Sequence, residues 1–211
     1  MRILVAGATG MVGRLVVEQA LERGHQVTAI ARHPQGLGLE HSDLRVEQAD
    51  ILMRDSIVPL LADVDAVISC VGIGTSKTPT TLYSVGAENL IAGMDEHQVQ
   101  RLVVISSEVA DHWAKKGFLK RCIVFPLLQK FLGATYDDMR RMDIVLWESD
   151  VQWTSVRSPR ITASAAKNDY RFSAEGPLSN GWQITSADMA MALLDWAERD
   201  DVGRKQVYVA N

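Results

Sequence analysis

A glycine-rich turn near the N-terminus constrains the fold more than any other part of this sequence. Four apolar residues lead into Gly7, Gly10 and Gly13, and apolar residues at helical spacing follow. A tight strand-to-helix turn needs glycine dihedrals at Gly7, and bare backbone at Gly10 lets a pyrophosphate approach the helix N-terminus. Gly13 lets the helix pack closely on the strand. The pattern predicts a dinucleotide site, against the alternative of a glycine-rich turn without a ligand. The expected contacts are Gly7, Thr9, Gly10, Met11, Val12 and Gly13.

The next apolar segment bears on which dinucleotide would bind. Residues 26–31 are mostly apolar, as expected of a parallel strand buried on both faces. The end of such a strand reaches the adenosine ribose, where NAD-binding sequences usually carry Asp or Glu. This sequence has Arg32 and His33 there instead. Because cations pair with a 2′-phosphate, we expect NADP(H) to be preferred over NAD(H); the alternative is a solvated surface arginine.

Strand and helix patterns alternate along the rest of the chain. This alternation predicts an α/β fold, a doubly wound and mostly parallel sheet in a single Rossmann domain spanning 1–211. A minimal substrate region is expected at about 159–211. The expected strands cover 44–47, 65–72, 101–106, 152–157 and 206–209, and the expected helices cover 80–97, 137–149 and 187–198.

Ligands of open parallel sheets lie outside the carboxyl ends of the strands, at the point where the strand order reverses. Asp50 and Ile51 follow one predicted strand, and Val71 and Gly72 end the next. These four residues are therefore expected to line the adenine and its ribose, with Asp50 accepting from the adenine amino group.

Composition excludes several classes of protein. The chain has 211 residues, of which 47% are hydrophobic, and a formal net charge of −4, so it suits one globular domain and has no general attraction to nucleic acid. Cys70 and Cys122 are expected to be buried or to serve packing, and the five histidines lack the spacing of metal ligands. Met1 and Arg2 lead directly into the first strand and no apolar run reaches spanning length, so we expect a cytoplasmic protein without a signal peptide.

Several motifs resemble those of a known family over nearly the whole chain. They are Gly7-Ala8-Thr9-Gly10-x-x-Gly13, Val27–Arg32, Asp65–Ile68, Pro79–Thr81, Gly86–Ile91, Val103–Ser107 and Thr154–Pro159. Together they resemble the atypical short-chain dehydrogenase/reductase family of NAD(P)H-binding, NmrA-like proteins, and within it the biliverdin-IXβ or flavin reductases. The resemblance implies NADPH as cofactor and a flat, stacking acceptor such as a flavin, which binds as a substrate and not as a tightly held cofactor.

The carbonyl-reducing members of that superfamily use a Tyr-x-x-x-Lys pair, in which the phenol protonates the developing alkoxide. This sequence has no such pair; its nearest approach is Tyr136 with Arg140, which we interpret as a helix-cap and surface segment. The missing acid argues against alcohol or sugar dehydrogenation and makes an epimerase or dehydratase the weakest hypothesis. It favours an acceptor such as flavin, which needs only a hydride and a proton from water.

The nicotinamide is expected near the carboxyl ends of the fifth and sixth strands. Ser106 and Ser107 end one strand, and Pro159 and Arg160 follow the other, with Ile161 next to them. The resemblance implies that Ser107 contacts cofactor and substrate. The sequence departs from the family at Met139 and Arg160, where histidines are common, and this puts biliverdin-like substrates in doubt.

These residues supply the catalytic candidates, with Arg160 as an anchor for an anionic group. In the alternative interpretation, the serine hydroxyls only finish a strand. The candidates are Ser106, Ser107 and Arg160.

One segment, 113–134, is both basic and rich in apolar residues. Pro126 interrupts it, so we expect an amphipathic flap beside the active site and no spanning helix. Its apolar half is expected to pack on the core; the alternatives are a homodimer or protein-partner contact, or contact with a membrane surface.

Two functions from different classes remain open. The first is an NADPH-dependent oxidoreductase that delivers a hydride to a flavin or a similar flat conjugated acceptor. The second is an NADP(H)-binding, redox-sensing regulatory protein with little turnover.

Overall fold

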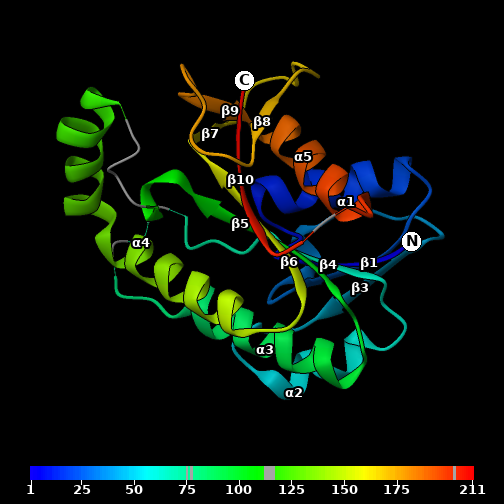
Figure 1. Ribbon diagram of the computed structural model, residues 1–211. Coiled ribbons are helices and arrows are strands. Elements are labelled where there is room, and N and C mark those ends of the chain that lie inside the picture. The colour runs from blue at the N-terminus through cyan, green and yellow to red at the C-terminus, as the bar shows by residue number, and fades with distance from the viewer. Residues whose placement is uncertain (75, 77, 112–116, 202) are drawn as a thin grey trace.

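The architecture is a twisted, mostly parallel sheet with helices on both faces (Figure 1). It comes from a computed structural model that describes residues 1–74, 76, 78–111, 117–201 and 203–211. Within these residues eight strands form one sheet in the order β3-β2-β1-β4-β5-β6-β10-β8, and only β8 is antiparallel to its neighbour. The strands are β1 (Arg2–Ala6), β2 (Gln26–Ala31), β3 (Leu44–Gln48), β4 (Ala66–Ser69), β5 (Arg101–Ser107), β6 (Gln152–Ser158), β8 (Arg171–Ser173) and β10 (Lys205–Ala210).

The helices divide between the two faces of this sheet, and each set covers its own hydrophobic core. Helices α1 and α5 pack together on one face, whereas α2, α3 and α4 lie on the other (Figure 1). Their bounds are α1 (Met11–Glu22), α2 (Arg54–Ile57), α3 (Leu82–Glu96), α4 (Phe125–Glu148) and α5 (Ser186–Glu198). No helix of the described residues combines the length and hydrophobicity that a membrane crossing requires.

The strand order reverses beside β1. Its residues pair in parallel with β2 on one side and with β4 on the other, so the chain winds outward from β1 in both directions. The central strands are buried on both faces, which explains their unbroken apolar sequences. The fold class expected from the sequence is confirmed, and β2 has the predicted bounds.

The helix predicted at 137–149 is the main error in the expected elements. Helix α4 begins at Phe125, twelve residues earlier, and follows a π-helical turn, η5 (Lys120–Val124). Pro126 does not interrupt it, because the proline lies in the first turn of α4, directly after the π-helical turn. The helix bends instead at Leu132, whose φ of −127° is not helical.

The C-terminal region belongs to the main domain. Strand β10 extends the sheet beside β6, and α5 packs against α1. Thr185 caps α5 by accepting a hydrogen bond from the Asp188 backbone at 3.0 Å. Only the small pair β7 (Arg160–Thr162) and β9 (Gln183–Thr185) lies outside the main sheet, so the substrate region predicted at 159–211 stays a prediction.

The N-terminus of α3 is capped by a carboxylate from α4. Asp138 is fully buried and accepts hydrogen bonds from the Tyr83 backbone N–H at 2.8 Å and from Ser84 Oγ at 2.5 Å. Its carboxylate also pairs with Arg141 at 3.2 Å. The charge lies where the helix dipole favours an anion, and it locks α3 against α4.

We expect Asp138→Ala to lower the free energy of unfolding by about 2 to 4 kcal/mol, because two buried donors lose their acceptor. Urea denaturation at neutral pH measures this loss. Asp137→Ala is the matched control: its carboxylate is half exposed and bonds Arg140, so the cost should stay below about 1 kcal/mol. Equal losses in the two variants would contradict the role of Asp138 as a buried cap.

Candidate functional site

A cavity of about 200 Å³ opens at the carboxyl ends of β1, β2, β3 and β4. This is the point where the strand order reverses, and it is the position at which open α/β sheets bind ligands. The chain segments that leave these four strands form its walls. The lining residues are Ala6, Gly7, Thr9, Gly10, Ile30, Ala31, Arg32, His33, Ala49, Asp50, Ile51, Cys70, Val71, Gly72 and Leu82.

The glycines of the turn after β1 are required by close backbone contacts. Gly7 has a φ of +79°, and a Cβ there would lie 2.9 Å from backbone atoms of Cys70 and Val71. A Cβ on Gly13 would lie only 2.2 Å from the Gly7 carbonyl oxygen, so α1 packs directly on the turn. Gly10 N–H donates to the same oxygen at 3.0 Å, which tightens the turn.

This turn fits a dinucleotide pyrophosphate. Helix α1 starts at Met11 with Gly10 as its N-cap, and its first turn contains no acidic residue. First-turn N–H groups have no partner within a helix, and together with the helix dipole they favour an anion. Met11 and Val12 do not line the cavity. The contact predicted for them is therefore one through their backbone N–H groups.

Arg32 and His33 lie at the cavity end that follows β2. Both side chains are exposed, and among the described residues no carboxylate forms an ion pair with Arg32. The short helical turn Pro34–Gly36 folds back toward the glycine turn after β1, with Gly36 close to the methyl group of Thr9. An arginine without a carboxylate partner, in the cavity wall, fits the pairing with a 2′-phosphate that the sequence predicts.

Asp50 and Ile51 line the cavity where the chain leaves β3. One carboxylate oxygen of Asp50 accepts a hydrogen bond from the Leu52 backbone at 3.0 Å, which holds the side chain in place. The Ile51 carbonyl accepts from the Asn89 side chain at 2.9 Å, and the Ile51 side chain packs over Gly86 on α3. The adenine contact proposed for Asp50 therefore involves a side chain fixed by its own turn.

The predicted nicotinamide-side residues lie apart from this cavity, at the ends of β5 and β6. The sheet register sets Ser107 beside Ser158, which directly precedes Pro159 and Arg160. Arg160 is exposed, and it opens β7 together with Ile161. The serines and the residues around Arg160 thus lie at the ends of two neighbouring strands, β5 and β6, as the sequence predicts. Their roles toward a ligand stay predictions.

Ser106 and Ser107 differ in what their hydroxyls contact. Ser107 Oγ accepts a hydrogen bond from the Val109 backbone at 3.2 Å and caps the short helix after β5, which matches the structural alternative for this residue. Ser106 is 1% exposed, and its Oγ has no hydrogen-bond partner among the described residues.

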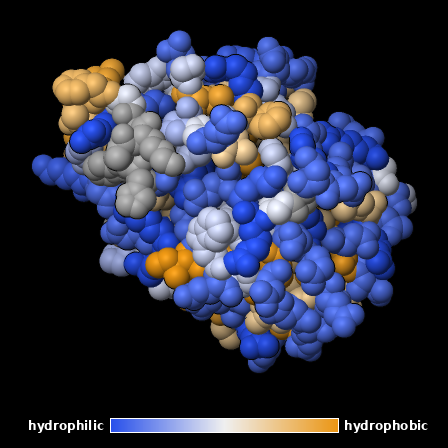
Figure 2. Space-filling view, viewed as in Figure 1, coloured by the Kyte–Doolittle hydropathy of each residue, from blue (hydrophilic) through white to orange (hydrophobic). Residues whose placement is uncertain are grey.

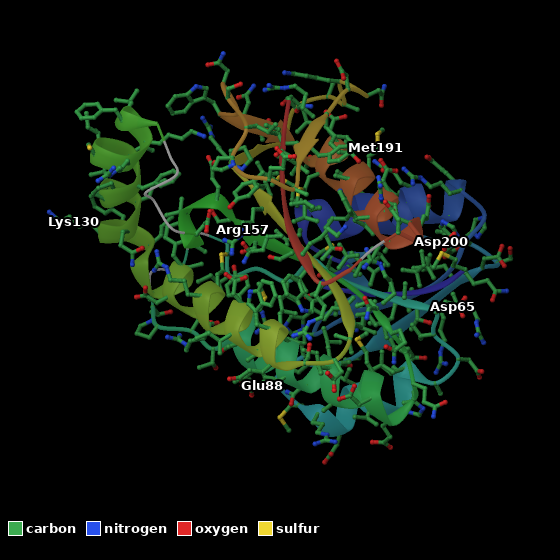
Figure 3. The ribbon with its side chains drawn as sticks, viewed as in Figure 1. Asp65, Glu88, Lys130, Arg157, Met191 and Asp200 are labelled. Atoms are coloured by element: carbon green, nitrogen blue, oxygen red, sulfur yellow. The ribbon has the colours of Figure 1, made fainter. Side chains whose placement is uncertain are left out.

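Beneath these serines an ion pair joins the sheet to α4. Arg157 on β6 pairs with Asp143 at 2.6 Å and donates to the Ser107 carbonyl at 3.1 Å. Figure 3 shows Arg157 in the interior, between the sheet and α4. Burial raises the pKa of Asp143, and the Arg157 charge opposes this rise. The pair fixes the end of β5 and with it the backbone at Ser107.

The segment around Tyr136 is not the surface helix cap expected from the sequence. Tyr136 is buried within α4, and burial raises the pKa of its phenol. Arg140 points elsewhere, donating to the carbonyls of Val109 and Ala110 at 3.1 and 3.2 Å. Arg140 therefore does not make the phenol more acidic, in contrast to the lysine of the Tyr-x-x-x-Lys arrangement.

Other residues around the site were missed or wrongly placed from the sequence. Leu82, at the start of α3, lines the cavity, as does Cys70, whose thiol pKa is raised by burial. Cys122 is exposed and not a packing residue. The described residues contain no group of three or more His, Cys, Asp or Glu side chains that could hold a metal ion.

A buried lysine ties the segment before α4 to the C-terminal region. Lys120 pairs with Glu108 at 2.6 Å and donates to the Gly181 carbonyl at 2.5 Å. Its ammonium also lies 4.9 Å from the Trp182 ring centroid. Residues 113–116 of the basic segment lie outside the described residues.

Comparison with known proteins gives the same cofactor class as this geometry. The model of the family described as NAD(P)H-binding matches residues 7–200. The photosystem II assembly factor Ycf39 of Synechocystis is 29% identical over 64% of this chain and 41% of its own length. The chain spans about half the length of the first curated relatives that it matches.

Solved structures share the fold over the full chain. A protein from Burkholderia pseudomallei, described as a putative exported protein, is 26% identical, with a TM-score of 0.82 and coverage of 100% of both chains. A short-chain dehydrogenase/reductase from Veillonella parvula, solved in complex with NADP, has a TM-score of 0.83 at 15% identity, with coverage of 100% of this chain and 94% of the other. At that identity the likeness shows the fold alone.

We expect Gly13→Ala to weaken NADPH binding by more than tenfold and to lower the free energy of unfolding by about 1 to 3 kcal/mol. The reason is that the new methyl group meets a backbone oxygen that cannot turn away. Fluorescence titration with NADPH and urea denaturation measure the two effects. Gly203→Ala is the control, because a Cβ there meets no atom within 4 Å. Unchanged NADPH affinity in Gly13→Ala would contradict the prediction that the glycine turn binds the pyrophosphate of the cofactor.

Proposed function

Because this chain belongs to the NAD(P)H-binding family, we propose that it is an NADPH-dependent oxidoreductase that reduces a flavin or a similar flat conjugated acceptor. The proposed preference for NADPH over NADH rests on the position of Arg32, which is exposed in the cavity wall where the adenosine ribose is expected. A guanidinium there forms stronger hydrogen bonds with a charged 2′-phosphate than with the neutral hydroxyl of an unmodified ribose. The bound cofactor supplies the hydride; the protein supplies binding, orientation and electrostatics.

A flavin-like acceptor is supported by the lack of the Tyr-x-x-x-Lys acid that carbonyl reduction uses. Tyr136 is buried with a raised pKa and has no lysine four residues later, so carbonyl reduction has no evident proton donor among the described residues. A flavin delocalises the charge that arrives with the hydride and takes its proton from water. The protein then has to hold two rings in stacking distance and exclude competing orientations.

Two groups at the ends of β5 and β6 are proposed to position the acceptor. Ser107 presents an oxygen whose place is fixed by Val109 and by the Arg157 contact to its carbonyl. Arg160 is exposed at the start of β7, two residues after the end of β6, and is suited to a flavin phosphate or another anionic group. In this proposal Ser106 shapes the site through its buried position next to Ser107.

Cofactor choice is tested at Arg32. We expect Arg32→Ala to weaken NADPH binding by about tenfold to a hundredfold, the range for a lost hydrogen bond to a charged group, and to leave NADH binding nearly unchanged. Calorimetric titration of both cofactors measures the two affinities. Arg45→Ala removes an exposed arginine from β3 and should change neither. Equal wild-type affinities for NADPH and NADH, or equal losses in Arg32→Ala, would refute the assignment.

The reaction is tested by steady-state oxidation of NADPH with FMN, FAD and riboflavin, beside a panel of aldehydes, ketones and sugar derivatives. We expect turnover with flavins and little with the carbonyl panel. Tyr136→Phe should keep flavin turnover within about twofold, because the phenol donates no proton in this reaction, whereas loss of a general acid costs a factor of about a hundred or more. A large loss in Tyr136→Phe, or turnover confined to carbonyl compounds, would overturn the proposal.

The same assay separates the enzyme from the redox-sensing alternative. Tight NADPH binding that depends on Arg32, together with negligible hydride transfer to every acceptor tested, would favour a regulatory protein. Cofactor binding and turnover are therefore measured on the same preparation.

A further inference from the structure

The N-terminal half of α4 and the turn before it carry large apolar side chains that are at least half exposed. These five side chains are between 50% and 79% exposed. Four of them recur at every fourth residue, so they lie along one side of successive helical turns. The members of this apolar stripe are Phe118, Leu119, Ile123, Leu127 and Phe131.

The bend at Leu132 separates two halves of α4 with different surroundings. Beyond it, the helix buries Tyr136, Met139 and Met142 against the core. Before it, the helix rises beside the body of the protein at the left of Figure 1, and Figure 2 shows an apolar patch on this projection. Phe125, Leu128 and Leu132 of this half pack on the core, so the stripe lies on the other side of the helix.

The charge of this segment is opposite to that of the chain. Residues 112–136 contain five Lys or Arg and no Asp or Glu, while the rest of the chain has seventeen basic and twenty-six acidic residues. Arg121 and Lys130 are exposed within the segment, and Figure 3 shows Lys130 pointing away from the body. Lys120 does not contribute to this surface, because it is buried against Glu108.

We propose that residues 117–132 dock on the surface of an anionic phospholipid bilayer. A helix with an apolar side and basic flanks lies in the membrane interface, with its apolar side chains in the acyl boundary and its cations at the headgroups. A second copy fits this face less well, since symmetric pairing would bring two segments of the same positive sign together. The buried contacts of Lys120 anchor the docking segment to the folded domain.

The test is sedimentation of the full-length protein with vesicles of phosphatidylcholine alone and of an equal mixture of phosphatidylcholine and phosphatidylserine. We expect binding to the mixed vesicles, no binding to neutral ones, and weaker binding as salt rises. Leu127→Gln should lower the partition coefficient by about tenfold or more, and Lys130→Glu by about fivefold or more.

Matched controls lie outside the segment. Met53→Gln removes an apolar side chain that is 61% exposed, and Lys167→Glu reverses an exposed charge; both should bind vesicles like the wild type. NADPH affinity and thermal melting confirm that each variant is folded. No sedimentation with mixed vesicles, equal sedimentation with neutral ones, or a lipid-independent dimer that Leu127→Gln dissociates would overturn the proposal.

Discussion

The contact between Gly13 and the Gly7 carbonyl fixes the distance between α1 and the turn after β1. A side chain at Gly13 would push the helix away from the turn, and a side chain at Gly7 would push the turn away from the backbone of Cys70 and Val71, which follow β4. The helix N-terminus, the reversal of strand order and the cavity all depend on this short distance. The shape of the cavity therefore depends on the absence of a Cβ atom at Gly7 and at Gly13.

Most residues that line the cavity could be predicted from the sequence because they directly follow a strand. Strand ends at one edge of a parallel sheet must meet, so Arg32, Asp50 and Val71 converge once the strands are identified. The ends of β5 and β6 were less predictable. Whether the Ser107 hydroxyl serves a ligand or a helix cap depends on the chain direction after β5, and no local pattern encodes that direction.

The errors in α4 have a common physical origin. Pro126 was taken as an interruption, but a proline at the start of a helix costs nothing and here marks its first turn. The exposed stripe gives α4 an apolar side that does not face the core, so hydrophobic periodicity could not tell which part of the helix is buried. Tyr136 was also expected on the surface, but its side chain belongs to the buried core between the sheet, α3 and α4.

The Asp138 cap has a consequence for the order in which the protein is assembled. A helix capped by its own neighbouring residues can form as soon as it is synthesised, whereas the cap of α3 comes from 54 or 55 residues later in the chain. Until α4 docks, the Tyr83 N–H and the Ser84 hydroxyl in the first turn of α3 lack this acceptor, and Leu82, which begins that turn, lines the cavity. A nascent chain that already contains the glycine turn and Arg32 is still without a finished dinucleotide site.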